Sequence, residues 1–83
     1  MYITVLEDDL ALQRAIINAL KMAGHKVVGF ENSSLLIENL DVKTELYLLD
    51  INVDGINGLE LLELLKRENP NVKVIIKHIP LEV

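Results

Sequence analysis

Apolar residues along the chain fall into short runs whose spacing alternates between that of a strand and that of a helix. A continuous β-branched and aliphatic run occupies residues 2–6, and comparable runs occupy residues 26–30 and 46–50. A fourth run begins at residues 72–76. Short, nearly continuous apolar runs bounded by polar residues are typical of buried strands. The pattern therefore predicts four strands.

Between these runs the apolar residues recur every three or four positions, which is typical of a helix that buries one face. Such a segment runs over residues 10–23 and is followed by Gly24, a residue suited to a left-handed C-cap. Residues 32–34 (Asn-Ser-Ser) supply N-cap residues for a second, shorter helix. Residues 59–68 predict a third helix, closed by Asn-Pro-Asn at residues 69–71.

The strict alternation of strands with helices predicts an α/β fold. Every connection between strands is long enough for a crossover, so we expect parallel pairing in a doubly wound sheet. The carboxyl ends of the strands then gather at one edge, where ligands bind in sheets of this kind. Glu7 and Asp8 follow the first strand and Asp50 ends the third, so all three carboxylates are expected at that edge.

Composition narrows the class of protein. With 83 residues, 51% of them hydrophobic, and a net charge of −5, the chain predicts one small acidic domain over residues 1–83. It has no cysteine for a disulfide framework or a thiolate zinc site. No apolar stretch reaches a membrane-spanning length, and residues 1–4 lack the basic start of a signal peptide, so we expect a cytoplasmic protein. The acidic balance argues against direct binding of nucleic acid.

The three carboxylates suggest a metal site. Carboxylates held together raise each other's cost of ionisation unless a cation lies among them, and oxygen ligands of this kind suit Mg²⁺. A carboxylate beside such a metal can attack a phosphoryl donor and form an aspartyl phosphate. Asp50 is the best nucleophile of the three, because it alone ends a central strand and precedes a glycine-punctuated loop at residues 51–58.

Structural roles would also explain these acids. Glu7, Asp8 and Asp9 would favour the positive end of the helix that follows, and capping of that helix is the alternative interpretation of the run. Asp50 could equally hydrogen-bond its own loop. The coincidence of two strands that end in acid, in the expected order, is what favours the functional interpretation.

The motifs resemble those of the receiver domain of two-component response regulators, the CheY-like group. Residues 5–9 (Val-Leu-Glu-Asp-Asp) resemble its acid-pair strand, and residues 48–62 its phosphoacceptor strand and loop. The resemblance covers residues 2–76 and implies a flavodoxin-like sheet of about four strands with three helices. It further implies that Asp50 is the phosphoacceptor and that Mg²⁺ is held by Glu7, Asp8, Asp50 and the backbone carbonyl of Asn52. The implied donor is the phosphohistidine of a sensor histidine kinase.

Departures from the family pattern also have consequences. Asp54 stands where the family usually has proline, and His78 stands where it has a Ser or Thr that contacts the phosphoryl group. The fifth strand, with its phosphate-pairing lysine, and the last two helices have no counterpart before Val83. The resemblance is therefore to a receiver truncated after its fourth strand, with impaired switching. Lys77 could supply the missing cation, although a solvated edge lysine is the simpler interpretation.

Loss of the fifth strand would leave the fourth as a sheet edge, and loss of the last helix would uncover an apolar strip. We therefore expect a homodimer formed through that edge or that sheet face. Three functions follow: a phosphoacceptor receiver with at most weak self-phosphorylation, a non-catalytic interaction module that uses the exposed edge, or a fragment of a full-length response regulator. None of them implies a small-molecule substrate.

Overall fold

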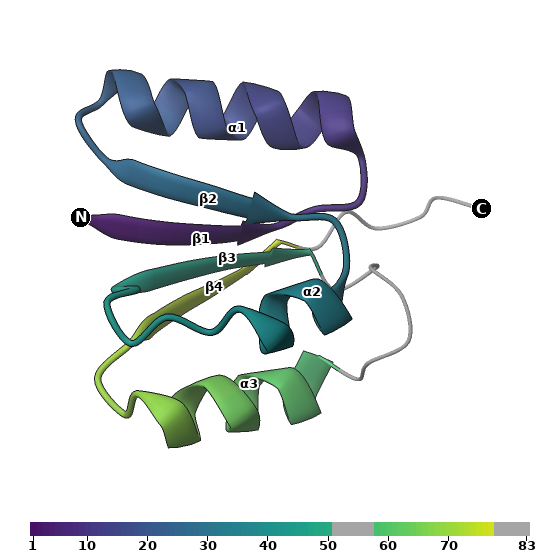
Figure 1. Cartoon of the computed structure of the whole chain (residues 1–83), viewed down its shortest axis with the longest axis vertical. Helices are drawn as coiled ribbons and strands as arrows, with labels where there is room; N and C mark the ends of the chain where they lie inside the picture. Colours follow the sequence, from purple (N-terminus) through teal and green to yellow (C-terminus); the bar gives the residue numbers. More distant parts are fainter. Residues whose placement is uncertain (51–57, 78–83) are drawn as a thin grey trace.

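The computed structural model describes residues 1–50 and 58–77, and within them strands and helices alternate as the sequence predicts (Figure 1). The elements are β1 (Tyr2–Leu6), α1 (Leu10–Met22), β2 (Lys26–Phe30), α2 (Ser33–Glu38), β3 (Leu46–Asp50), α3 (Gly58–Glu68) and β4 (Lys73–Lys77).

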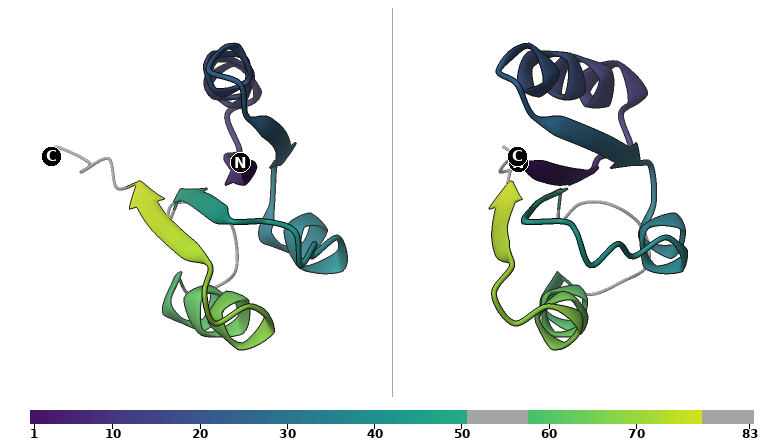
Figure 2. Two further views of the ribbon diagram at one scale, coloured as in Figure 1. Left: turned by 90° about the vertical axis from the view of Figure 1, so that its left-hand side faces the viewer. Right: turned by 60° about the vertical axis from the view of Figure 1, so that its left-hand side comes forward.

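All strands of the sheet are parallel, in the order β2-β1-β3-β4. Helix α1 lies on one face of the sheet, and α2 and α3 lie on the other (Figures 1 and 2). The strand order reverses beside β1, because the chain passes first to β2 on one side and then to β3 on the other. This is the predicted doubly wound α/β sheet, and its edges in the described chain are β2 and β4.

Alternating residues along each strand supply two separate cores. The larger lies between the sheet and helices α2 and α3, and the smaller lies beneath α1. The larger contains Leu6, Leu36, Tyr47, Leu49, Leu61, Leu65 and Val72. The smaller contains Ile3, Val5 and Val27, with Ile16, Ile17, Leu20, Leu46 and Leu48 packed against them. Both faces of β1 are therefore covered, which explains its continuous apolar run.

Element boundaries agree with the predicted ones to within one residue. Gly24 has φ 94°, so the glycine expected after α1 does adopt the left-handed conformation. Helix α3 begins one residue early, at Gly58. Strand β4 begins at Lys73 instead of residue 72, because the Val72 N–H donates to the carbonyl of Asn69 in the preceding turn. Among the described residues, no helix has the length and apolarity needed to cross a membrane.

Candidate functional site

The carboxylates of Glu7, Asp8 and Asp50 come together at the carboxyl end of the sheet. Each offers an oxygen, and these oxygens all lie within 4.8 Å of one another. The sheet register brings this about: Leu6 of β1 pairs with Leu49 of β3, and Glu7 and Asp50 are the residues that follow them. The cluster predicted from the ends of the two strands is therefore present in the fold.

The three carboxylates differ in their surroundings. Glu7 is buried, with 2% of its surface exposed, whereas Asp8 is exposed and Asp50 is half-buried. The Glu7 N–H donates to the carbonyl of Phe30 at 3.0 Å, which extends the contact between β1 and β2 past the end of β1. Its carboxylate oxygen Oε2 accepts from the N–H of Asp9 at 3.1 Å. Glu7 is thus held through both its main chain and its side chain.

Capping of α1 is the role of Asp9. Its Oδ1 atom accepts hydrogen bonds from the N–H groups of Ala11 at 3.1 Å and Leu12 at 3.2 Å. The structure therefore divides the acidic run between two roles. Asp9 is the N-cap residue of α1. The carboxylate oxygens of Glu7 and Asp8 instead lie near a carboxylate oxygen of Asp50.

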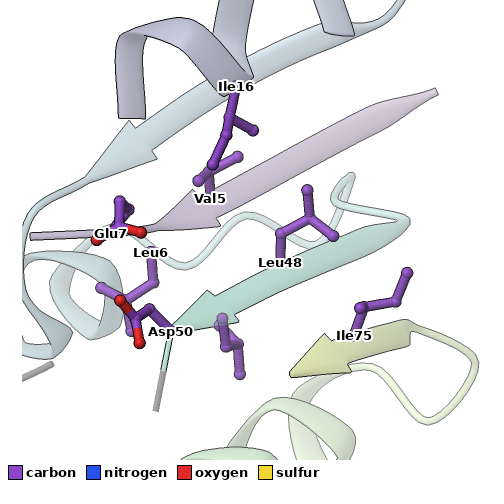
Figure 3. Close-up of a pocket in the computed structure, with 8 residues that line it drawn as sticks. Val5, Leu6, Glu7, Ile16, Leu48, Asp50 and Ile75 are labelled. Atoms are coloured by element: carbon purple, nitrogen blue, oxygen red, sulfur yellow. The ribbon is translucent and has the colours of Figure 1, made fainter. Parts of the chain in front are cut away.

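A small cavity of about 90 Å³ adjoins the cluster on the α1 face of the sheet (Figure 3). Glu7 and Asp50 lie at one end of it, and apolar side chains form the rest of the wall. Its lining consists of Val5, Leu6, Glu7, Ile16, Leu48, Leu49, Asp50 and Ile75. Apolar surroundings lower the local dielectric, so charges at this end of the cavity interact more strongly than they would in water.

The donor set fits a hard divalent cation. Three carboxylates that approach within 4.8 Å repel one another when ionised, and a cation among them removes that repulsion. Mg²⁺ takes oxygen ligands and commonly uses one or two carboxylates together with water. Asn52, whose backbone carbonyl was the fourth expected ligand, lies outside the described residues, as does His78.

Asp50 is not alone in lying at the end of a central strand. We expected it to be the only acid that ends a central strand, but β1 is also interior in the order β2-β1-β3-β4. Asp50 is nevertheless the last residue of its strand, whereas Glu7 and Asp8 follow theirs. Its partner in the parallel register is Lys77, the last residue of β4. The main chain of this lysine therefore runs beside that of Asp50.

Sequence reasoning missed Gln13 and Gly29. The side-chain Nε2 of Gln13 donates to the backbone carbonyl of Glu7 at 2.9 Å. Gly29 lies in β2 beneath this amide, where a Cβ atom would come within 2.6 Å of Gln13 Oε1. A glycine inside a strand often marks a close approach by another part of the chain, and that signal was available in the sequence.

Comparison with known proteins agrees with the fold described above. The family model described as the response regulator receiver domain matches residues 3–77. The DNA-binding transcriptional regulator NtrC of Escherichia coli K12 is 37% identical over 73 residues, which cover 87% of this chain and 16% of NtrC. The response regulator receiver protein CpdR of Brucella abortus is 31% identical over 74 residues, covering 88% of this chain and 62% of CpdR. The chain thus spans less than two thirds of either relative.

A solved structure shares the fold. The response regulator protein TrrA from Thermotoga maritima, crystallised in complex with Mg²⁺-BeF, superposes with a TM-score of 0.80. The match covers 90% of this chain and 66% of TrrA, with 24% sequence identity. Such a likeness between two chains of low identity establishes the arrangement of strands and helices described above.

Proposed function

This chain belongs to the response regulator receiver domain family, and from that membership we propose that Asp50 accepts a phosphoryl group with Mg²⁺ held by Glu7, Asp8 and Asp50. The observation that carries the proposal is the approach of three carboxylate oxygens to within 4.8 Å of one another at the joined ends of β1 and β3. The crystallisation of TrrA with Mg²⁺-BeF lends support from a protein of the same fold.

The proposed reaction is a transfer between two nucleophiles. A carboxylate oxygen of Asp50 forms a bond to phosphorus while the bond from phosphorus to the donor atom breaks. With the phosphohistidine of a sensor histidine kinase as donor, the P–N bond breaks and its electron pair leaves with the imidazole. The product on this chain is a mixed anhydride, an aspartyl phosphate. Mg²⁺, when bound, neutralises charge on the phosphoryl oxygens.

The proposed roles of the site residues follow from their positions in the fold. Asp50 is half-buried at the end of an interior strand, where its backbone pairs with Lys77 of β4, and the preceding residue, Leu49, is paired on both sides. Buried Glu7 and exposed Asp8 provide the acid pair that holds the metal, with the Asn52 carbonyl as a further proposed ligand. Because His78 replaces the family hydroxyl, we propose that phosphorylation is poorly coupled to a change of shape. The domain is then a regulatory acceptor and does not turn over a separate substrate.

Intact mass spectrometry tests the acceptor. Incubation with Mg²⁺ and a small acyl phosphate is expected to add one phosphoryl group to the wild-type chain, with release of the free carboxylate of the donor. Asp50→Asn removes the nucleophile and is expected to remain unmodified. Glu63→Gln changes an exposed acid on α3 and serves as the matched control, so it should accept phosphate like the wild type. A folded wild-type chain that gains no adduct would contradict the proposal.

Calorimetry tests the metal site separately. It compares substitutions of Asp8 and Asp9, two neighbouring acids with different roles. Asp8→Asn removes one of the clustered carboxylates, whereas Asp9→Asn retains a good capping residue. We expect Mg²⁺ binding to weaken by about 10-fold or more in the first variant and to change little in the second. Equal effects of the two substitutions would indicate that only the general charge of this loop matters.

A second proposed function is self-association, supported by the surface of β4. Ile75 is 55% exposed and Ile76 is 40% exposed on this edge strand, and they point to opposite faces of the sheet. Isoleucines exposed along an unpaired edge favour contact with another copy. Light scattering at micromolar concentration is expected to give the mass of a dimer, and Ile75→Glu a monomer. Met22→Glu, at an 89% exposed position on α1, is the control and should remain dimeric. A monomeric wild type would exclude this function.

A further inference from the structure

We infer that Gln13 is a positioning residue for the acid pair: its side chain fixes the main chain at Glu7, so the seating of α1 on β2 determines where the Glu7 and Asp8 carboxylates lie. This inference rests on the proposed Mg²⁺ site. It concerns a residue in the first turn of α1, five positions after Asp8, whose side chain carries a hydrogen-bond donor and no carboxylate.

The first observation behind this inference is that two hydrogen bonds join Gln13 to the segment formed by residues 7–9. Gln13 Nε2 donates to the Glu7 carbonyl at 2.9 Å, in a partly buried position. The Gln13 N–H donates to the Asp9 carbonyl at 2.8 Å, which closes the first turn of α1. One residue therefore bonds to the main chain on both sides of Asp8. The conformation of the segment that carries the acid pair depends on where Gln13 lies.

The second support is the main-chain bond on the other side of Glu7. Its N–H donates to the carbonyl of Phe30 at the end of β2, at 3.0 Å. The N–H of Glu7 is thus tied to β2 and its carbonyl to α1. A shift of α1 along β2 would pull these two anchors apart and turn the residue between them. Because Glu7 is buried, its carboxylate has little room to compensate for such a turn.

The third support is the space that Gly29 leaves for the amide. A Cβ atom at this position would lie 2.6 Å from Gln13 Oε1 and 2.7 Å from Gln13 Cδ. It would also lie 2.7 Å from Ile17 Cδ1, one turn further along the same helix. These distances are shorter than an ordinary van der Waals contact, so a larger residue at this position would displace the ends of the Gln13 and Ile17 side chains. Gly29 therefore leaves the space in which the Gln13 amide reaches the carbonyl of Glu7.

Substitution of Gln13 separates its donor from its packing. Gln13→Met keeps a long, flexible side chain over Gly29 and removes the N–H donor. We expect this variant to bind Mg²⁺ about 10-fold more weakly, as is typical when a group that orients a metal ligand is lost. The control is Asn18→Leu, which removes an exposed amide from the same helix and should bind like the wild type.

Gly29→Ala tests the position of the Gln13 amide independently, because the added methyl group would push that amide aside. We expect Gly29→Ala and Gln13→Ala each to weaken Mg²⁺ binding by about 10-fold, and the double variant to lose about 10-fold in total instead of 100-fold. A merely structural role for both residues would give independent losses. If Gly29→Ala fails to fold, Gln13→Met still decides the matter.

Amide hydrogen exchange in metal-free protein keeps this test distinct from the test of the metal site. The Asp9 N–H is bonded to the Glu7 carboxylate, so it reports whether Glu7 is in place. Gln13→Met is expected to speed its exchange about 5-fold, the equivalent of one lost hydrogen bond, while Asn18→Leu leaves it unchanged. If the wild type binds no Mg²⁺, the proposed function fails and exchange alone decides the role of Gln13. Unchanged exchange and unchanged Mg²⁺ binding in Gln13→Met would overturn the inference.

Discussion

The hydroxyl groups of Thr4 and Thr44 are hydrogen-bonded to each other at 2.9 Å inside the protein. Thr4 lies in β1, and Thr44 lies just before β3. The Thr44 side chain also acts on the phenol of Tyr47 and lowers its pKa. Three polar side chains therefore lie close together where β1 meets the start of β3. Buried polar groups stabilise a fold only while each has a partner, so we expect these side chains to matter for stability.

Loss of the Thr44 hydroxyl should cost most. Thr44→Val removes the hydrogen-bond partner of Thr4 and the hydroxyl that acts on Tyr47, and we expect it to lower the free energy of unfolding by about 1–3 kcal/mol. Thr4→Val leaves the Thr44 hydroxyl beside Tyr47 and is expected to cost about 1 kcal/mol. Urea unfolding of the two variants measures the difference. A larger loss in Thr4→Val than in Thr44→Val would contradict this order of contributions.

Stability is expected to fall at high pH through Tyr47. Burial raises the pKa of this phenol above its ordinary value of 10.0, and the charges of Asp41 and Glu68 raise the pKa further, although the hydrogen bond with Thr44 opposes them. The folded state thus holds its proton more tightly than the unfolded state. The resulting stability is fully present below pH 10.0 and is lost as the pH rises toward the folded-state pKa.

Urea unfolding on either side of that range measures the effect. The free energy of unfolding of the wild type should decrease between about pH 9 and about pH 11. Tyr47→Phe cannot ionise, so its stability should decrease less over the same interval. Equal pH dependence in the two proteins would show that groups other than Tyr47 dominate alkaline unfolding.

The two neighbouring acids after β1 should differ in their effect on stability. Asp9→Ala removes two hydrogen bonds to the first turn of α1 and is expected to cost about 1 kcal/mol. Asp8→Ala removes an exposed carboxylate that repels its neighbours and should cost nothing in metal-free protein. Thermal unfolding without metal checks both. A similar loss in the two variants would indicate that Asp8 shares the capping role.

Mg²⁺ should stabilise the folded chain in proportion to its occupancy. A ligand that binds only the folded state at about 100 times its dissociation constant adds about 2.7 kcal/mol to the free energy of unfolding. We expect that increase in the wild type and in Glu63→Gln, and a much smaller one in Asp50→Asn. Urea unfolding with and without Mg²⁺ measures it. Equal stabilisation of Asp50→Asn would remove this carboxylate from the proposed ligand set.

The sequence was sufficient for the fold because its signals are local. Apolar runs, helical spacing and Gly24 each act within a few residues, and the parallel order then places Glu7 and Asp50 at one edge. It could not separate the capping acid from the clustered ones, since Glu7, Asp8 and Asp9 are alike in type and adjacent. Helix orientation decides that assignment, and it becomes visible only in three dimensions.

The contacts that were missed join distant parts of the chain. The bond from Gln13 to Glu7 joins α1 to the end of β1, and Gly29 of β2 leaves space for the Gln13 side chain. Thr4 and Thr44 are 40 residues apart in the sequence, so their spacing does not predict that their hydroxyl groups are hydrogen-bonded. Such contacts follow from tertiary packing, and a hydrophobic pattern carries no information about them.

Chemical mapping of the modified residue tests most directly whether Asp50 is the phosphoacceptor. Borohydride reduces an acyl phosphate to the alcohol, so a phosphorylated aspartate becomes homoserine, which peptide sequencing by mass spectrometry identifies. After incubation with Mg²⁺ and a small acyl phosphate, homoserine should appear at position 50 and at no other aspartate. It should be absent when Mg²⁺ is withheld. Homoserine at another position, or an unreduced Asp50 in a chain that carries a phosphoryl group, would contradict the assignment.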